Sequence, residues 1–312
     1  MWSNASCYYS SNASGAKRKQ DWIEEQPKKK EKRSSEMSFH LNEDVCFYIL
    51  QFVDWKTLLT SCKRVSKLWF NASSYLKVMI RKYDQSIKAL VNCPFMINLT
   101  VLHLDKDRKD GDACAYYIAW SEHMRGLTDL SLPSVSPYGV SSIASSVYMS
   151  NLKILTLHGG GIDSIASSFY ITQLTSLEVH EASFYDFSAI ANCENMKQLT
   201  RLHLIGNDTE LNAESISNFV KSPYLNNLTD LSLDKNKLQE SSVKEIMNST
   251  MVQKLQVLSL SKTSLTITGV DYIAKSTQLK NLTSLTLSNN FSNKEDIQTV
   301  TQKLKSIRLL EI

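Results

Sequence analysis

Hydrophobic residues recur in one pattern from residue 99 to the end of the 312-residue chain. The pattern is L-x-x-L-x-L, where x is mostly polar, and it occurs nine times at intervals of 22 to 29 residues. Its first apolar residues are Leu99, Leu127, Leu152, Leu174, Leu199, Leu228, Leu255, Leu282 and Ile307. Alternation at the fourth and sixth residues is typical of a β-strand with one buried face. Self-similarity at this spacing predicts a stack of repeated units.

Helical stretches separate these strands. Apolar residues at helical spacing are Val243, Ile246, Met247 and Met251 in "ESSVKEIMNSTMVQK", and Val270, Ile273, Ala274 and Leu279 in "TGVDYIAKSTQLKN". Only neighbouring units can cover the apolar surface of each strand–helix unit, so we expect one continuous core. The sequence therefore predicts an α/β solenoid of about nine strand–helix repeats, with a parallel sheet on the concave side and helices on the convex side.

The residue after each strand motif predicts how the chain turns. Asparagine stands at the ninth position in the fifth, sixth and eighth repeats, as Asn207, Asn236 and Asn290, whereas repeats two to four carry Val135, Gly160 and Ala182 there. A buried asparagine can satisfy backbone groups at such a turn. We therefore expect less regular turns in repeats two to four. The chain stops inside the ninth motif, which predicts an open strand edge available for pairing.

This periodicity resembles that of the leucine-rich repeat family over residues 98–312, about two thirds of the chain. In such a motif the third, fifth and seventh residues point to the concave side. Four of the six histidines fall there, as His103, His158, His180 and His203. His158 and His180 hold the same position in consecutive strands, and His203 is level with Glu178, with Arg201 two residues away.

These concave residues predict a polar patch for a target protein over repeats three to five, with pH-sensitive histidine charge. Two alternatives stay open: imidazoles with a carboxylate can bind a metal ion, and a concave strand surface is polar by default. The candidate target-binding residues are His103, His158, Glu178, His180, Arg201 and His203. An acidic rim formed by Asp105, Asp129, Asp230 and Asp234 would favour basic targets.

Charge is concentrated at the N-terminus. Residues 1–35 carry eight Lys/Arg and four Asp/Glu, so they account for the whole net charge of +4. We expect a disordered basic tail, since apolar residues are too few to offset the ordering entropy. Its clusters, residues 17–19 and 28–33, resemble a bipartite nuclear import signal, with a solvated linker as the alternative. The neutral remainder argues against a large nucleic-acid surface.

Other features exclude several classes of protein. No run of 18 apolar residues and no signal-peptide core occurs, so we expect neither a membrane span nor secretion, and place the chain in the cytoplasm, the nucleus or both. The six cysteines are scattered and are expected to be reduced. Because no Gly-rich phosphate loop, nucleophile elbow or H-E-x-x-H motif occurs, we expect no enzyme activity, no cofactor and no resident metal.

A second pattern lies in "LNEDVCFYILQFVDWKTLLTSCKRVSKLWF", residues 41–70. Asn42 can cap a helix whose first turn carries Glu43 and Asp44, which suits the helix dipole. An apolar stripe follows, and Asp54 can cap a second helix. Together with a third helix through Trp69, this segment has more apolar surface than thirty residues can bury alone.

This segment resembles an F-box over residues 37–80, with residues 81–97 as linker and N-terminal cap. The matching residues are Leu41, Glu43, Asp44, Ile49, Leu50, Leu58, Leu59, Val65, Ser66, Lys67 and Trp69, while Asn42 stands where the family has proline. The resemblance implies binding to the Skp adaptor of a cullin–RING ubiquitin ligase. By carry-over, the adaptor-binding residues are Leu41, Val45, Ile49, Leu50, Leu58 and Trp69.

An F-box followed by leucine-rich repeats implies a non-catalytic substrate-recognition subunit of a Skp–cullin–F-box ubiquitin ligase. The F-box would bind the adaptor, and the repeats would hold a target protein for ubiquitination. The alternative is a leucine-rich repeat interaction scaffold not connected to ubiquitination. A GTPase-activating repeat protein is disfavoured, because no arginine stands out as a catalytic finger and the repeat lengths are irregular.

Overall fold

The computed structural model describes residues 78–80, 87–206, 210–211 and 213–312. By internal contacts the chain divides into residues 1–40 and 41–312, and every described residue lies in the second unit. The predicted tail, the F-box segment through residue 77 and Asn207 lie outside the described residues.

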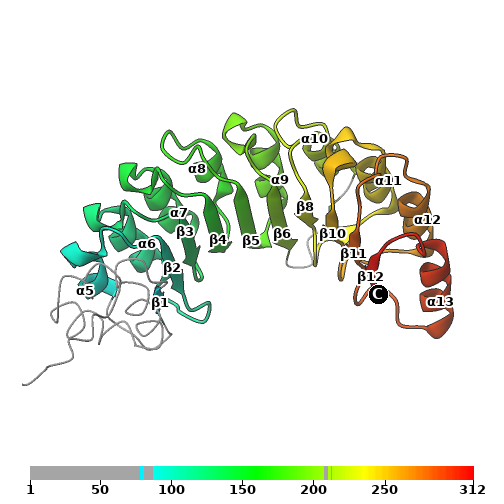
Figure 1. The fold of residues 1–312 in the computed structure, drawn as a ribbon, viewed down its shortest axis with the longest axis horizontal. Helices are drawn as coiled ribbons and strands as arrows, with labels where there is room; N and C mark the ends of the chain where they lie inside the picture. The colour runs from blue at the N-terminus through cyan, green and yellow to red at the C-terminus, as the bar shows by residue number, and fades with distance from the viewer. Residues whose placement is uncertain (1–77, 81–86, 207–209, 212) are drawn as a thin grey trace, which may run out of the picture. The chain divides into compact units, whose positions relative to one another are not determined.

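The described strands form one open parallel sheet of ten strands, in the order β1-β2-β3-β4-β5-β6-β8-β10-β11-β12 (Figure 1). The strands of this sheet are β1 (Val78–Ile80), β2 (Val101–Leu104), β3 (Asp129–Leu132), β4 (Ile154–His158), β5 (Ser176–Ala182), β6 (Arg201–Gly206), β8 (Asp230–Ser232), β10 (Val257–Ser259), β11 (Ser284–Thr286) and β12 (Leu309–Glu311). A separate two-stranded sheet pairs β7 (Glu210–Leu211) with β9 (Lys237–Leu238).

Nine of the ten strands coincide with the nine sequence motifs, which confirms the predicted strand positions. The tenth, β1, was not predicted, since its sequence Val-Met-Ile carries no L-x-x-L-x-L motif. It lies at the end of the range expected for the F-box and pairs in parallel with β2. The sheet therefore begins before the first motif.

Equal motif positions face each other across the sheet. Leu130 pairs with Leu155, Leu155 with Leu177, and Leu177 with Leu202. These leucines have no exposed surface, and the same holds for Leu231 one strand further on. The repeated motif thus produces a continuous apolar row, and the core extends from one repeat into the next.

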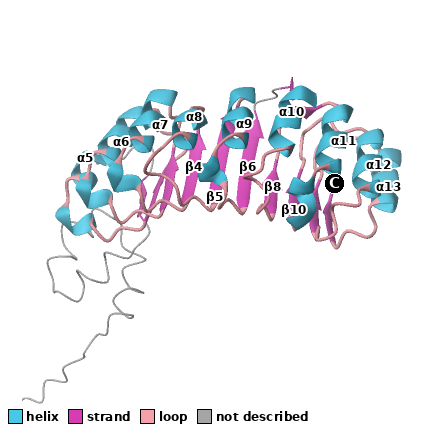
Figure 2. Cartoon of the chain, turned by 90° about the horizontal axis from the view of Figure 1, so that it is seen from above, coloured by secondary structure: helices cyan, strands magenta, loops and turns pink. Residues whose placement is uncertain are grey.

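Helices alternate with the strands and lie on one side of the sheet (Figure 2). The α-helices are α5 (Ile87–Val91), α6 (Gly111–Ala119), α7 (Pro137–Ala144), α8 (Ile162–Ala166), α9 (Phe184–Ala191), α10 (Ala213–Val220), α11 (Glu240–Asn248), α12 (Ile267–Lys275) and α13 (Lys294–Lys303). Short 3-10 helices are η2 (Pro94–Met96), η3 (Glu122–Met124), η4 (Val147–Met149), η5 (Glu194–Met196) and η6 (Thr250–Lys254). This arrangement is compatible with a solenoid of strand–helix units.

The predicted helix faces are mostly correct. Val243, Ile246, Met247, Val270 and Ile273 are buried on α11 and α12, whereas Met251 is buried beyond the end of α11, in η6. Ala274 is exposed, contrary to prediction, because it lies at the edge of the face that buries Gly269, Val270 and Ile273. Leu279 lies beyond the end of α12 and packs against the core from a loop.

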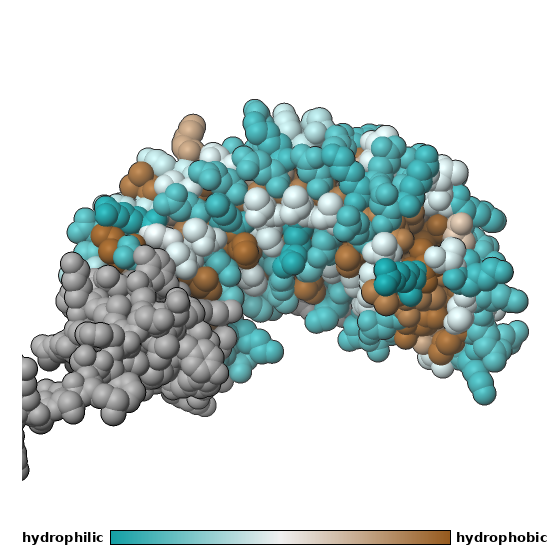
Figure 3. Space-filling view, viewed as in Figure 1, coloured by the Kyte–Doolittle hydropathy of each residue, from teal (hydrophilic) through white to brown (hydrophobic). Residues whose placement is uncertain are grey.

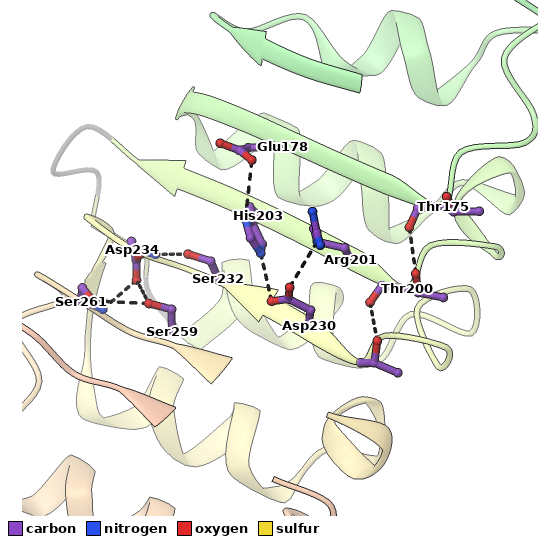
Figure 4. A network of polar contacts seen from close by, with 11 residues as sticks. Thr175, Glu178, Thr200, Arg201, His203, Asp230, Ser232, Asp234, Ser259 and Ser261 are labelled. Carbon is purple, nitrogen blue, oxygen red and sulfur yellow. Dashed lines mark hydrogen bonds and ion pairs between the residues drawn. The ribbon is translucent and has the colours of Figure 1, made fainter. Parts of the chain in front are cut away.

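Two ladders of side-chain hydrogen bonds join each repeat to the one before it. On the helix side, a hydroxyl or thiol donates to the carbonyl at or near the end of the preceding helix, over 2.5 to 2.7 Å. The donors are Ser121, Ser146, Ser168, Cys193, Ser222, Ser249 and Ser276. At the start of the strands, threonines such as Thr200, the residue before β6, donate to the carbonyl of the neighbouring repeat, here Thr175 (Figure 4). Each repeat thereby satisfies backbone acceptors of the previous one.

The predicted asparagines act as turn supports. Asn236 has no exposed surface and donates to the carbonyls of Leu204, Leu233 and Asp234. Asn290 donates to Leu260 and Leu287 in the same way. These contacts confirm the prediction for the sixth and eighth repeats.

Positive φ angles occur at the turns both with and without asparagine, since the eighth motif residue has a positive φ at Gly159, Glu181, Lys235, Lys262 and Asn289. Gly159 (φ 144°) and Gly161 (φ 105°) flank the turn of the third repeat. A Cβ at Gly159 would lie 2.0 Å from the backbone oxygen of Val135, so a side chain does not fit. In the fourth repeat Glu181 has a φ of 64°, and the register between β5 and β6 shifts between His180 and Ala182. The register shift thus distinguishes the turn of the fourth repeat, whereas the φ angles do not set repeats two to four apart from the repeats with asparagine.

The last strand of the sheet, β12, pairs with β11 alone. Hydrophobic side chains gather on the surface at this end (Figure 3), and Leu309 is exposed. Among the described strands, β12 thus has one edge without a pairing strand. Over the described residues, no helix is both long and apolar enough to span a membrane.

Candidate functional site

The exposed face of the sheet brings the predicted polar residues together. Along each strand, buried motif residues alternate with residues that face away from the core. His158 and His180 are in register on β4 and β5, as predicted, and their rings stack at a centroid distance of 4.1 Å and an angle of 11°. Glu178 on β5 is in register with His203 on β6, as predicted.

A chain of charged contacts crosses β5, β6 and β8 (Figure 4). Glu178 Oε1 is 2.7 Å from His180 Nε2, and its Oε2 is 3.8 Å from His203 Nδ1. His203 Nε2 lies 3.0 Å from Asp230 Oδ1, and Arg201 Nε lies 3.3 Å from Asp230 Oδ2. We call Glu178, His180, Arg201, His203 and Asp230 the His203 network.

His203 is the central cation of this network. Burial opposes its charged form, but the hydrogen bond to Asp230 and the nearby carboxylate of Glu178 outweigh that cost and raise the pKa of His203 to about 9. The hydrogen bond with His180, and after it the nearby imidazole of His203, hold the pKa of the Glu178 carboxyl far below its usual range. Both groups are therefore ionised at neutral pH, in a partly buried site where their charges are only weakly screened.

His158, whose ring stacks on His180 beside the network, has a lowered pKa, in contrast to His203. Burial lowers the pKa of His158, and the neighbouring His180 lowers it further, which together outweigh the attraction of Glu178. A neutral imidazole at His158 can donate one hydrogen bond and accept another. The face thus presents a neutral ring next to fixed charges.

His103 does not belong to the network. It lies on β2, and its Nε2 is 2.8 Å from Oδ1 of Asp129 on β3. The structure thus separates His103 from the other predicted target-binding residues.

The carboxylates that pair with His103 and His203 were predicted only as members of an acidic rim. Asp129 and Asp230 each sit one strand further along and two residues before the level of their histidine. A histidine at the fifth motif position followed by aspartate at the third position of the next motif is the sequence signal for such diagonal pairs. Asp234 is likewise engaged, since it accepts hydrogen bonds from Ser259 Oγ and the Ser261 backbone.

The His203 network holds fixed charges at neutral pH. His203, with a pKa of about 9, is protonated there and in that form does not act as a general base. In the part of the chain that the structure describes, no group of three or more His, Cys, Asp or Glu side chains is arranged to hold a metal ion. What the network offers a partner is a fixed pattern of charged donors and acceptors.

The predicted adaptor-binding residues Leu41, Val45, Ile49, Leu50, Leu58 and Trp69 lie outside the described residues. Comparison of the sequence with known proteins adds no family: no protein-family model matches the chain, and no curated protein matches it.

Proposed function

We propose that this chain is the non-catalytic substrate-recognition subunit of a Skp–cullin–F-box ubiquitin ligase. Its F-box segment, residues 37–80, binds the Skp adaptor, and its leucine-rich repeat solenoid holds the target protein. The target-binding half of the proposal rests on one observation, the His203 network on the exposed sheet face. A partly buried cluster of ionised groups orients its charges rigidly, which suits selective recognition of a protein surface.

The adaptor-binding half rests on the F-box pattern of the sequence. Its six aliphatic and aromatic anchors, from Leu41 to Trp69, are large enough to contribute about 1.5–3 kcal/mol each when fully buried, before the cost of association. Such a segment needs a partner or a neighbouring domain to cover it. An adaptor helix pair is the partner that the pattern favours.

Co-expression with the Skp adaptor tests this half. We expect the wild-type chain to co-purify with the adaptor, and Ile49→Asp and Trp69→Ala to lose it, because a charge or a cavity is placed among the anchors. Lys244→Ala, at an exposed position of α11, is the matched control and should bind like wild type. Failure of the wild-type chain to co-purify would leave only the alternative of a scaffold unconnected to ubiquitination.

The target-binding half requires a separate test in the assembled ligase. Replacing His158, His180 and His203 by alanine should reduce the capture and ubiquitin conjugation of the proteins that wild type recruits, with adaptor binding intact. His103→Ala lies outside the network and serves as the control. Equal conjugation by the triple variant and wild type would reject the His203 network as the recognition surface.

A further inference from the structure

The helix side of the sheet carries a hollow at its shortest repeat. The third repeat has the smallest spacing between motifs, 22 residues from Leu152 to Leu174. Its helix α8 has 5 residues, whereas α7 and α9 on either side have 8 each. Because the short helix fills less space than its neighbours, the surface sinks between α7 and α9.

Three hollows, of about 660, 580 and 270 Å³, lie around α8 and share lining residues. The first two share Asp163, Ala189 and Asn192, and the second and third share Ser168 and Phe169. They therefore form one groove, which we call the α8 groove. Serine, alanine and glycine make up much of its lining, which we call the floor, so a bound segment can approach the backbone there.

Two aromatic side chains that line this groove are largely exposed to solvent. Phe169 is 94% exposed and Tyr185 is 79% exposed, and both line the groove. They belong to a larger set of exposed large apolar residues in the helix-bearing part of the first four repeats: Tyr116, Trp120, Tyr138, Val147, Phe169, Tyr170 and Tyr185. A concentration of this kind on one side of a protein is typical of an interaction surface.

The charge of the groove is negative. Between Ser136 and Met196 the sequence has five Asp/Glu and a single Lys/Arg. Asp163 is exposed in the groove, and no described residue forms an ion pair with it. Asp186 accepts hydrogen bonds from Ser183 and the Ile162 backbone, and Glu194 pairs with Lys197. No Lys or Arg lines any of the three hollows.

We propose that the α8 groove is a docking site for a lysine- or arginine-bearing segment of a partner protein. The aliphatic stem of the basic residue packs over the small side chains of the floor, while its charged end lies near Asp163. The rings of Phe169 and Tyr185 offer faces for cation–π contact at the rim. Unlike the His203 network, which lies on the exposed sheet face, this site lies on the helix side, so one chain can hold two proteins at once (Figure 2).

Binding of a labelled synthetic peptide tests the site on the full-length chain. The probe is a short peptide of alternating lysine and leucine, and a peptide with glutamate in place of lysine is its counterpart. We expect the lysine peptide alone to bind, and Asp163→Asn and Phe169→Ser each to weaken it about fivefold, as for the loss of one exposed ion pair or cation–π contact. Glu245→Gln on α11 and Ile297→Ser on α13 are exposed controls outside the groove lining, and both should bind like wild type.

Three results would overturn the α8 groove as a docking site for a basic segment. If Asp163→Asn and Glu245→Gln weaken binding of the lysine peptide equally, the binding is nonspecific electrostatic attraction and not docking in the groove. Absence of lysine-peptide binding would reject the site outright. A concentration-dependent dimer that Phe169→Ser abolishes, without peptide binding, would assign the groove to a second copy of this chain. Co-purification with the Skp adaptor should be unchanged in every groove variant, so the result does not depend on the proposed ligase function.

Discussion

At the scale of single residues, the pKa values of His203 and Glu178 predict how stability depends on pH. The pKa of His203 is raised from 6.5 to about 9, so its contribution to stability is complete below about pH 6.5 and is lost as the pH rises through 9. The pKa of Glu178 is lowered from 4.5, so its contribution is complete above that value and is lost on acidification. The network therefore stabilises the fold most between about pH 4.5 and 6.5.

We expect the free energy of unfolding to fall between pH 6 and pH 9, with roughly 2 kcal/mol of the loss due to His203. His203→Gln should remove this part of the pH dependence, because glutamine does not titrate. Urea denaturation at several pH values measures the effect, and His103→Gln is the control. An equally steep decline in His203→Gln and wild type would contradict the proposed role of His203 as a partly buried cation.

At the scale of elements, the hydroxyl ladder predicts which contacts join the repeats. Ser222 is buried and donates to the carbonyl of Ala191 at the end of α9. Ser222→Ala leaves that acceptor without its partner, which costs about 1–3 kcal/mol. Chemical denaturation should detect this loss, while Ser241→Ala, at an exposed position of α11, should change stability by less than about 0.5 kcal/mol. Equal effects of the two variants would show that the ladder does not stabilise the stack.

Sequence patterns predicted the strands better than the parts between them. Nine strands were predictable because the same apolar alternation recurs nine times, and each strand must bury its leucines against the next. The strand Val78–Ile80 carries no such motif, and its conformation depends on pairing with β2. The sequence pattern therefore could not predict it. Likewise, the exposure of Ala274 follows from the direction in which α12 packs, which helical spacing alone does not fix.

The candidate site was predictable where it depends on register alone. His158 and His180, like Glu178 and His203, occupy equal motif positions, so the sequence predicted that they are neighbours. The contact of His203 with Asp230 runs diagonally across two strands, and its existence depends on side-chain rotamers. The charge of His203 was equally hidden, because burial and hydrogen bonds shift its pKa in opposite directions and only the folded geometry decides between them.

At the scale of the whole described sheet, the core is continuous but each repeat contacts mainly its neighbours. In such a stack, stability is approximately a sum of repeat and interface terms. A central defect should therefore weaken the coupling on both of its sides, whereas a terminal one affects a single interface. The His203 network spans three consecutive strands, β5, β6 and β8. A defect in the central strand β6 should therefore affect both stability and the geometry of the network.

Leu202→Ala in β6 and Ile307→Ala near β12 compare a central with a terminal defect. Leu202 has no exposed surface, so its truncation should cost about 2–5 kcal/mol and leave a cavity below the His203 network. Ile307 is only partly buried and follows α13 at the end of the sheet, so its truncation should cost less. Hydrogen exchange should show faster exchange in β5, β6 and β8 for Leu202→Ala and faster exchange confined to β11 and β12 for Ile307→Ala. Uniformly faster exchange in both variants would mean that the ten strands unfold as one cooperative unit, without separable repeats.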